Sequence, residues 1–190
     1  MRTLDRILQR WRIAKALPWI PRTRPDGGLP ALLDIGCFDD ALLRRVSPRV
    51  ERAVGLDPLA EPRAFANVQI VRGSLPAAPG EAPLPNASFD CVTMLAVLEH
   101  IPAREALARE CARVLRPGGR VVITVPKPAV DRILAVLLSL RLIHGMSLEQ
   151  HEGYDVRRTS PIFEAAGLRL LRRRTFQLGL NCLFVFEKPR

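Results

Sequence analysis

The chain has 190 residues, which suffice for one domain with a hydrophobic core but not for two domains of ordinary size. Hydrophobic residues make up 48% of the sequence, and this proportion argues against a disordered chain. The formal net charge of +10 favours an acidic partner, either a nucleic acid or an anionic membrane surface, unless it reflects only a genome rich in arginine codons. The four cysteines form no C-x-x-C pair and have no histidine at metal-ligand spacing, so they predict no metal site and suit the reducing cytoplasm.

Residues 1–28 are predicted to form an N-terminal amphipathic helix and a linker. Apolar side chains recur at helical spacing over residues 3–17 with arginines between them, and the prolines and glycines that follow end the helix. A basic helix of this kind either binds an anionic lipid surface or folds over the site of the domain that follows it. Basic residues interrupt residues 1–15 before any apolar run forms, so we expect no signal peptide.

Residues 29–190 are predicted to form the main domain. In its first part short apolar strands alternate with helices, which is typical of a parallel sheet with helices on both faces. The expected strands are 31–35, 52–56, 68–72, 89–95 and 120–125. The expected helices are 39–46 and 103–115, and the second ends at a Pro-Gly-Gly sequence.

The last third of the chain changes pattern. A strongly apolar helix is expected over 129–146 and a short helix over 159–166. Residues 168–176 and 181–187 are then expected to pair as an antiparallel hairpin around a Leu-Gly turn. The fold class is therefore α/β: a Rossmann-like three-layer αβα sandwich with a mostly parallel seven-stranded sheet and an antiparallel C-terminal hairpin.

A glycine and an acid mark the ends of the first two strands. Gly36 closes the first strand and lets backbone N–H groups approach a ligand closely. Asp57 ends the second strand, where a carboxylate can accept hydrogen bonds from ribose hydroxyls, and its separation from Gly36 fits a nucleotide site. Alone, this pair does not distinguish one adenosine-containing cofactor from another.

An ordered set of motifs resembles that of a known family. The motifs are Asp34-Ile35-Gly36-Cys37, Val54-Gly55-Leu56-Asp57, Phe89-Asp90-Cys91-Val92 with Leu98-Glu99-His100-Ile101, and Val114-Leu115-Arg116-Pro117-Gly118-Gly119. Together they resemble the motifs of the class I S-adenosylmethionine-dependent methyltransferases, of the small-domain, type-11-like kind, over residues 29–190. An NAD-binding domain has no reason to carry the Leu-Arg-Pro-Gly-Gly element or the terminal hairpin.

The resemblance implies S-adenosylmethionine as cofactor, with S-adenosylhomocysteine as its product. It implies that Gly36 passes under the methionine part, that Asp34 holds the loop or meets the amino group, and that Asp57 takes both ribose hydroxyls. Ser74 stands where the family often has an acid that reads the adenine amine, which implies a weaker contact. The full implied set is Asp34, Gly36, Cys37, Phe38, Asp57, Pro58, Leu59, Gly73, Ser74, Leu75, Met94, Leu95 and Ala96.

The first loop departs from the family pattern, because Phe38 and Asp40 replace its second and third glycines. One interpretation is that Phe38 points into the core and the loop tolerates the change. The other is that the chain has lost the cofactor and serves as a non-catalytic scaffold or binding module. Asp40 is also expected to bring a negative charge near the amino-acid part of the cofactor.

Two histidines are candidate catalytic bases, because imidazole titrates near neutral pH. His100 begins a helix, where a positioning role is expected over proton transfer. His151 lies beyond the fifth strand, beside Tyr154, where this architecture places acceptor-specific elements. The alternative for His151 is a polar capping loop, and many methyl transfers need no base because proximity supplies most of the acceleration.

The expected function is transfer of a methyl group to a small molecule, a sugar or a lipid-linked glycan. Residues 176–181 resemble a segment of small methyltransferases among bacterial cell-surface polysaccharide and glycolipid enzymes. The expected location is the cytoplasm, with peripheral contact at the inner membrane face through anionic lipid as an option. A nucleic-acid methyltransferase is an alternative that the charge favours, although the arginines are spread out rather than gathered with aromatic residues. The acceptor and the oligomeric state do not follow from the sequence.

Overall fold

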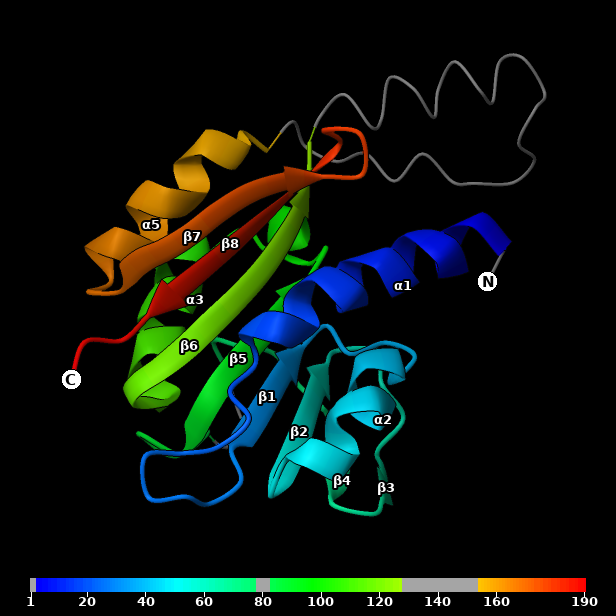
Figure 1. Ribbon diagram of the computed structural model, residues 1–190, viewed down its shortest axis with the longest axis vertical. Coiled ribbons are helices and arrows are strands. Elements are labelled where there is room, and N and C mark those ends of the chain that lie inside the picture. Colours follow the sequence, from blue (N-terminus) through cyan, green and yellow to red (C-terminus); the bar gives the residue numbers. More distant parts are fainter. Residues whose placement is uncertain (1–2, 78–82, 128–153) are drawn as a thin grey trace.

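The computed structural model describes residues 3–77, 83–127 and 154–190, and for residues 3–5 the backbone alone. These residues form three layers, with a central sheet between two layers of helices (Figure 1). The predicted helix over 129–146 and the candidate base His151 lie outside the described residues. No helix in the described part of the chain is both long and apolar enough to cross a bilayer. The helices are α1 (Thr3–Ala16), α2 (Ala41–Val46), α3 (Arg104–Val114) and α5 (Thr159–Ala165), with 3-10 turns at Leu17–Trp19, Ser47–Arg49, Leu98–His100 and Val156–Arg158.

One sheet of eight strands joins them, in the order β3-β4-β2-β1-β5-β6-β8-β7. The five strands from β4 to β6 run parallel, whereas β8 and β7 are antiparallel to their neighbours. The Rossmann-like fold with a mostly parallel sheet and a C-terminal hairpin is therefore confirmed. The strands are β1 (Ala31–Ile35), β2 (Arg52–Asp57), β3 (Arg63–Phe65), β4 (Val68–Arg72), β5 (Phe89–Leu95), β6 (Leu115–Pro126), β7 (Arg169–Phe176) and β8 (Asn181–Glu187).

The expected count of seven strands missed β3. This strand has three residues, lies antiparallel to β4 at the edge of the sheet, and exposes two of its three side chains. A strand this short and exposed has no apolar run that would mark it in the sequence.

Apolar side chains fill both spaces between the sheet and its helices. On one face α1 and α2 contribute Ile13, Ala16 and Leu43 to a buried cluster. On the other face α3 and α5 contribute Leu107 and Phe163 to a second cluster. The central strand β1 is buried along its whole length, which explains why it is a continuous apolar run rather than an alternating one.

The family motifs at the amino ends of the strands serve the fold. Asp90 Oδ2 accepts hydrogen bonds from Ala31 N at 2.7 Å and from Arg116 Nη1 at 2.6 Å, which ties the beginnings of β1, β5 and β6 together. The expected turn after α3 is part of β6, because the strand begins at Leu115 directly after the helix. Gly119 is needed there, since a Cβ would lie 2.9 Å from the Arg116 carbonyl oxygen.

Candidate functional site

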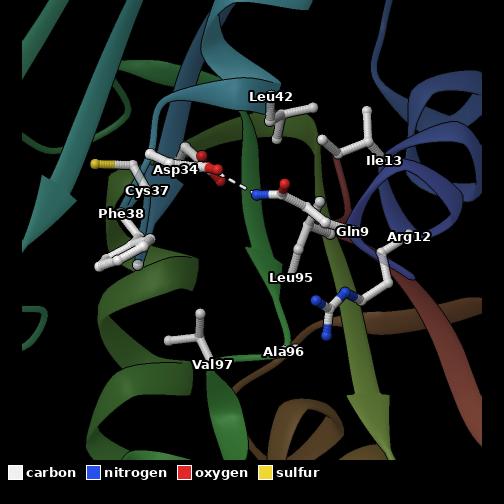
Figure 2. Close-up of a pocket in the computed structure, with 12 residues that line it drawn as sticks. Gln9, Arg12, Ile13, Asp34, Cys37, Phe38, Leu42, Leu95, Ala96 and Val97 are labelled. Atoms are coloured by element: carbon white, nitrogen blue, oxygen red, sulfur yellow. Dashed lines mark hydrogen bonds between the residues drawn. The ribbon is translucent and has the colours of Figure 1, made fainter. Parts of the chain in front are cut away.

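Two adjoining hollows lie at the carboxyl ends of the parallel strands, where ligands bind in open α/β sheets. The small hollow, of about 240 Å³, lies between α1 and the ends of β1 and β5 (Figure 2). The large hollow, of about 640 Å³, lies over the ends of β1 and β2 and the segments that follow β4 and β5. The two hollows share four lining residues, which are Gly36, Phe38, Ala96 and Val97.

Gly36 passes between the two hollows in a conformation that requires glycine. Its φ is +72°, in the left-handed region, and its backbone N–H donates to the Leu56 carbonyl oxygen at 2.7 Å. A Cβ at this position would lie 2.3 Å from Cγ2 of Val97. The loop therefore presents bare backbone where β1 ends.

Phe38 has a backbone conformation that glycine adopts more readily than other residues, because its φ of 26° is positive. The side chain is 68% exposed and lines both hollows. The interpretation that Phe38 points into the core is therefore wrong. The ring instead stands at the boundary between the two hollows.

Asp40 also adopts a left-handed conformation, with φ at 55°, but its carboxylate lies elsewhere. The side chain is buried and forms ion pairs with Arg44 Nε at 2.5 Å and with Arg63 Nη2 at 3.2 Å. It is not among the residues that line either hollow. The expectation that Asp40 brings a charge near the cofactor is corrected, because two arginines hold and neutralise this carboxylate beside α2.

Asp57 ends β2 with its carboxylate in the wall of the large hollow. Oδ1 accepts the Leu59 N–H at 2.8 Å and Oδ2 accepts the Phe38 N–H at 3.2 Å. These two bonds fix the carboxylate between the loops after β1 and β2. Each carboxylate oxygen accepts more than one hydrogen bond, so Asp57 can still receive two hydroxyl groups from a ligand.

Asp34 lies one strand away, in the wall of the small hollow. It is almost fully buried, and its Oδ1 accepts a hydrogen bond from Thr93 Oγ1 at 2.6 Å. Burial raises the pKa of Asp34 to about 7, against the opposing effect of the Thr93 hydrogen bond and with a further upward contribution from the charges of Asp39 and Asp57. A cation entering the small hollow would favour the ionised form of this carboxyl group.

Helix α1 closes the small hollow with Gln9, Arg12 and Ile13, none of which was among the predicted site residues (Figure 2). Gln9 Nε2 donates to Asp39 Oδ1 at 2.7 Å and so fastens the helix to the loop after β1. The polar positions of the basic amphipathic helix were the only signal for this role. The arrangement agrees with the interpretation in which the helix folds over the site.

The other predicted residues divide between the two hollows and the core. Ser74 lines the large hollow, and its hydroxyl donates to the Pro76 carbonyl oxygen at 2.9 Å. His100 also lines it, with Nε2 at 4.0 Å from Glu99 Oε1. Met94 lines neither hollow, because its side chain is fully buried in the core. Of the other residues that the sequence predicted for the site, the large hollow contains Pro58, Leu59, Gly73 and Leu75, and the small hollow contains Cys37 and Leu95.

Residues 33–123 match the family model described as a methyltransferase domain. A relative named a probable S-adenosylmethionine-dependent methyltransferase, from Mycolicibacterium smegmatis, is 32% identical over an alignment that covers 75% of this chain and 59% of the relative. A ubiquinone biosynthesis O-methyltransferase of Sodalis glossinidius is 28% identical over 59% of this chain and 49% of its own length. The chain thus spans about half the length of these relatives.

Among solved structures, the fold matches a chain of the complex between the Haloferax volcanii Trm112 methyltransferase activator and a methyltransferase. The TM-score is 0.71 over 96% of this chain and 91% of that chain, at 16% sequence identity. At this identity the match shows the fold alone.

Proposed function

We propose that the chain is a class I S-adenosylmethionine-dependent methyltransferase that binds S-adenosylmethionine across the two hollows and transfers its methyl group to an acceptor. The family-model match over residues 33–123 and the relative from Mycolicibacterium smegmatis support this proposal. One observation carries this proposal: Asp34 and Asp57, at the ends of neighbouring strands, line the two hollows on either side of the Gly36 loop. The cofactor has an ammonium group at one end and two ribose hydroxyls near its middle. Two carboxylates separated by an open backbone loop suit such a ligand.

The described residues fit each part of the cofactor. We assign Asp57 to the ribose hydroxyls and Asp34 to the ammonium group, because a buried carboxyl with a raised pKa is stabilised by a cation. Arg12 lines the same hollow and suits the α-carboxylate. Pro58 and Leu59 supply apolar surface for the adenine in the large hollow.

When bound, the cofactor supplies an electrophilic methyl group. The contribution of the chain is to hold that group against the acceptor and to exclude water, since proximity and orientation supply most of the acceleration in such transfers. Leu95 and Ala96 line the small hollow at the end of β5, beside the methionine end in this assignment. We assign His100 a positioning role, because the buried carboxylate of Glu99 lies next to its ring. The role of His151 as a base stays a prediction.

We propose a small molecule, a sugar or a lipid-linked glycan as acceptor. A relative named as a ubiquinone biosynthesis O-methyltransferase supports a small molecule as acceptor. A non-catalytic binding module is the second candidate, and the observation that favours it is the aromatic ring of Phe38 at the boundary of the hollows. A cytoplasmic location is supported by the cysteines, all four of which are unpaired and buried.

Methyl transfer can be tested with S-adenosylmethionine labelled in the methyl group. The purified protein is incubated with the labelled cofactor and with separated aqueous and lipid fractions of bacterial cells. We expect label to enter one fraction with the wild type and not with Asp57→Asn. Label in neither fraction, from a protein that binds S-adenosylhomocysteine, would leave the binding module as the better account.

A further inference from the structure

Helix α1 has an outer face that the described residues leave open. Its exposed side chains form a pattern in which Ile7, Trp11 and Ala14 lie in line along the helix, because successive residues are 100° apart around the axis. Ile7 is 47% exposed and Trp11 is 51% exposed. We call the surface formed by these exposed residues the outer face; it consists of Arg6, Ile7, Arg10, Trp11, Ala14 and Lys15.

Cations flank the apolar line on both sides. At helical spacing Arg6 and Arg10 fall on one flank and Lys15 on the other, and the outer face contains no acidic side chain. An apolar line with an aromatic residue between two cationic borders is the pattern by which a helix lies in the headgroup region of a lipid bilayer.

The opposite side of α1 is fixed to the domain, so the outer face is held outward. Ile13 and Ala16 are buried in the core shared with α2. Gln9 Nε2 donates to Asp39 Oδ1 at 2.7 Å. Gln177 Nε2, from the turn between β7 and β8, donates to the Leu8 carbonyl oxygen at 3.0 Å. Rotating the helix to cover Ile7 and Trp11 would break all of these contacts.

The turn that holds α1 adds a further exposed apolar side chain. Leu178 follows Gln177 directly and is 97% exposed. Its φ is 56°, so a leucine occupies a left-handed turn position that glycine or asparagine would fill with less strain. Leu178 is thus an exposed apolar side chain in a turn that contacts α1 through Gln177 and Leu8.

We propose that the outer face of α1 docks this protein onto a lipid bilayer that carries anionic headgroups. The cationic borders match the anionic headgroups, and Ile7 and Trp11 enter the interface. A nucleic acid would use the cations as well, but an apolar line in the middle of the face suits acyl chains and not phosphates. Since the inner side of α1 lines the small hollow, docking also brings the proposed site close to lipid-borne acceptors, a consequence that rests on the proposed function.

The test is co-sedimentation of the full chain with vesicles of phosphatidylcholine alone and of phosphatidylcholine mixed with an equal part of phosphatidylglycerol. We expect binding to the mixed vesicles only, and weaker binding at higher salt. Arg6→Glu with Arg10→Glu should weaken binding by roughly tenfold or more, since each nearby cation strengthens it by roughly fivefold. The control is Arg109→Glu with Arg157→Glu, which makes the same change of charge at exposed positions of α3 and the 3-10 turn at Val156–Arg158.

The apolar part of the surface has its own readout. In a Trp19→Phe variant Trp11 is the one remaining tryptophan, and its fluorescence should shift to shorter wavelength when mixed vesicles are added. Ile7→Ser with Trp11→Ser should abolish sedimentation while S-adenosylhomocysteine binding is unchanged. The proposal is overturned if mixed vesicles do not bind the chain, or if Arg109→Glu with Arg157→Glu weakens binding as much as Arg6→Glu with Arg10→Glu. It is also overturned if a single-stranded RNA binds through Arg6 and Arg10 and vesicles do not bind. If the wild type binds mixed vesicles but does not bind S-adenosylhomocysteine, only the proposed function is contradicted.

Discussion

Phe38→Gly distinguishes the stability of the first loop from its part in ligand binding. The side chain is 68% exposed, so only about a third of its surface is buried, and its removal gives up about 0.5–1 kcal/mol of apolar burial. Glycine also lowers the free energy of unfolding by about 0.5–1 kcal/mol, because it gives the unfolded chain more conformational entropy. Against this, the left-handed φ of 26° costs a non-glycine residue about 1–2 kcal/mol, which glycine recovers.

These contributions nearly cancel, so the free energy of unfolding should change by less than about 1 kcal/mol, or the melting temperature by less than about 4 °C in a chain of this size. The fully buried Phe163 provides the control, and Phe163→Leu should cost more than Phe38→Gly. Thermal melts of both variants make the comparison. A loss above about 3 kcal/mol for Phe38→Gly would refute the exposed position of the ring, because a loss of that size is typical of a packed phenylalanine.

The same variant reports on the ligand. Because the ring lines both hollows, we expect its loss to weaken S-adenosylhomocysteine binding by about five- to tenfold through lost apolar contact. Calorimetric titration measures this change. Tighter binding by the variant would show that the ring obstructs the site and would favour the non-catalytic module.

Three further perturbations follow from the geometry. Burial raises the pKa of Asp34 from 3.8 to about 7, so its carboxyl group is neutral below that pH. The affinity for S-adenosylhomocysteine should therefore fall about tenfold from pH 8 to pH 6. Calorimetric titrations at each pH should show that Asp34→Asn removes this dependence. The raised pKa of Asp34 also makes the ligand-free protein less stable as the pH rises from about 4 to 7, because Asp34 loses its proton at lower pH in the unfolded chain than in the folded one. Gly36→Ala should lower the free energy of unfolding in denaturant by about 2–5 kcal/mol, because alanine is strained at a left-handed φ and its Cβ would overlap the Val97 side chain. Adding Val97→Ala should restore only the stability lost through that overlap. Asp90→Ala should lower the free energy of unfolding by about 2–3 kcal/mol, since it leaves Ala31 N and Arg116 without their acceptor, while calorimetry of the folded variant shows unchanged S-adenosylhomocysteine affinity.

The sheet could be predicted from the sequence because its strands carry local signals. The strand over 31–35 and the strand over 89–95 are buried on both faces, so their apolar runs stand out and their predicted bounds agree with β1 and β5. The edge strand β3 has no such run and was missed. The predicted set of site residues rested on ordered motifs at the ends of these strands, where the chain direction of a parallel sheet brings distant segments to one edge.

The parts of the site that escaped prediction depend on contacts between distant segments. The pairing of Gln9 with Asp39 joins residues 30 positions apart, and no local pattern indicates which side of α1 meets that loop. The ion pair of Asp40 with Arg63 likewise joins residues 23 positions apart, whereas its pair with Arg44 is a local one within α2 and its N-terminus. Of the two interpretations of Phe38, the buried ring was wrong because an aromatic residue is usually buried, whereas this side chain is 68% exposed.

The central claim is that Asp57 anchors S-adenosylmethionine at the end of β2. Calorimetric titration of the wild type and of Asp57→Ala with S-adenosylhomocysteine tests it most directly. The account predicts that the wild type binds and that the variant binds about 10- to 100-fold more weakly, because a carboxylate hydrogen bond to a ribose hydroxyl contributes about 1.5–3 kcal/mol. No binding by the wild type, or equal binding by a folded variant, would contradict it.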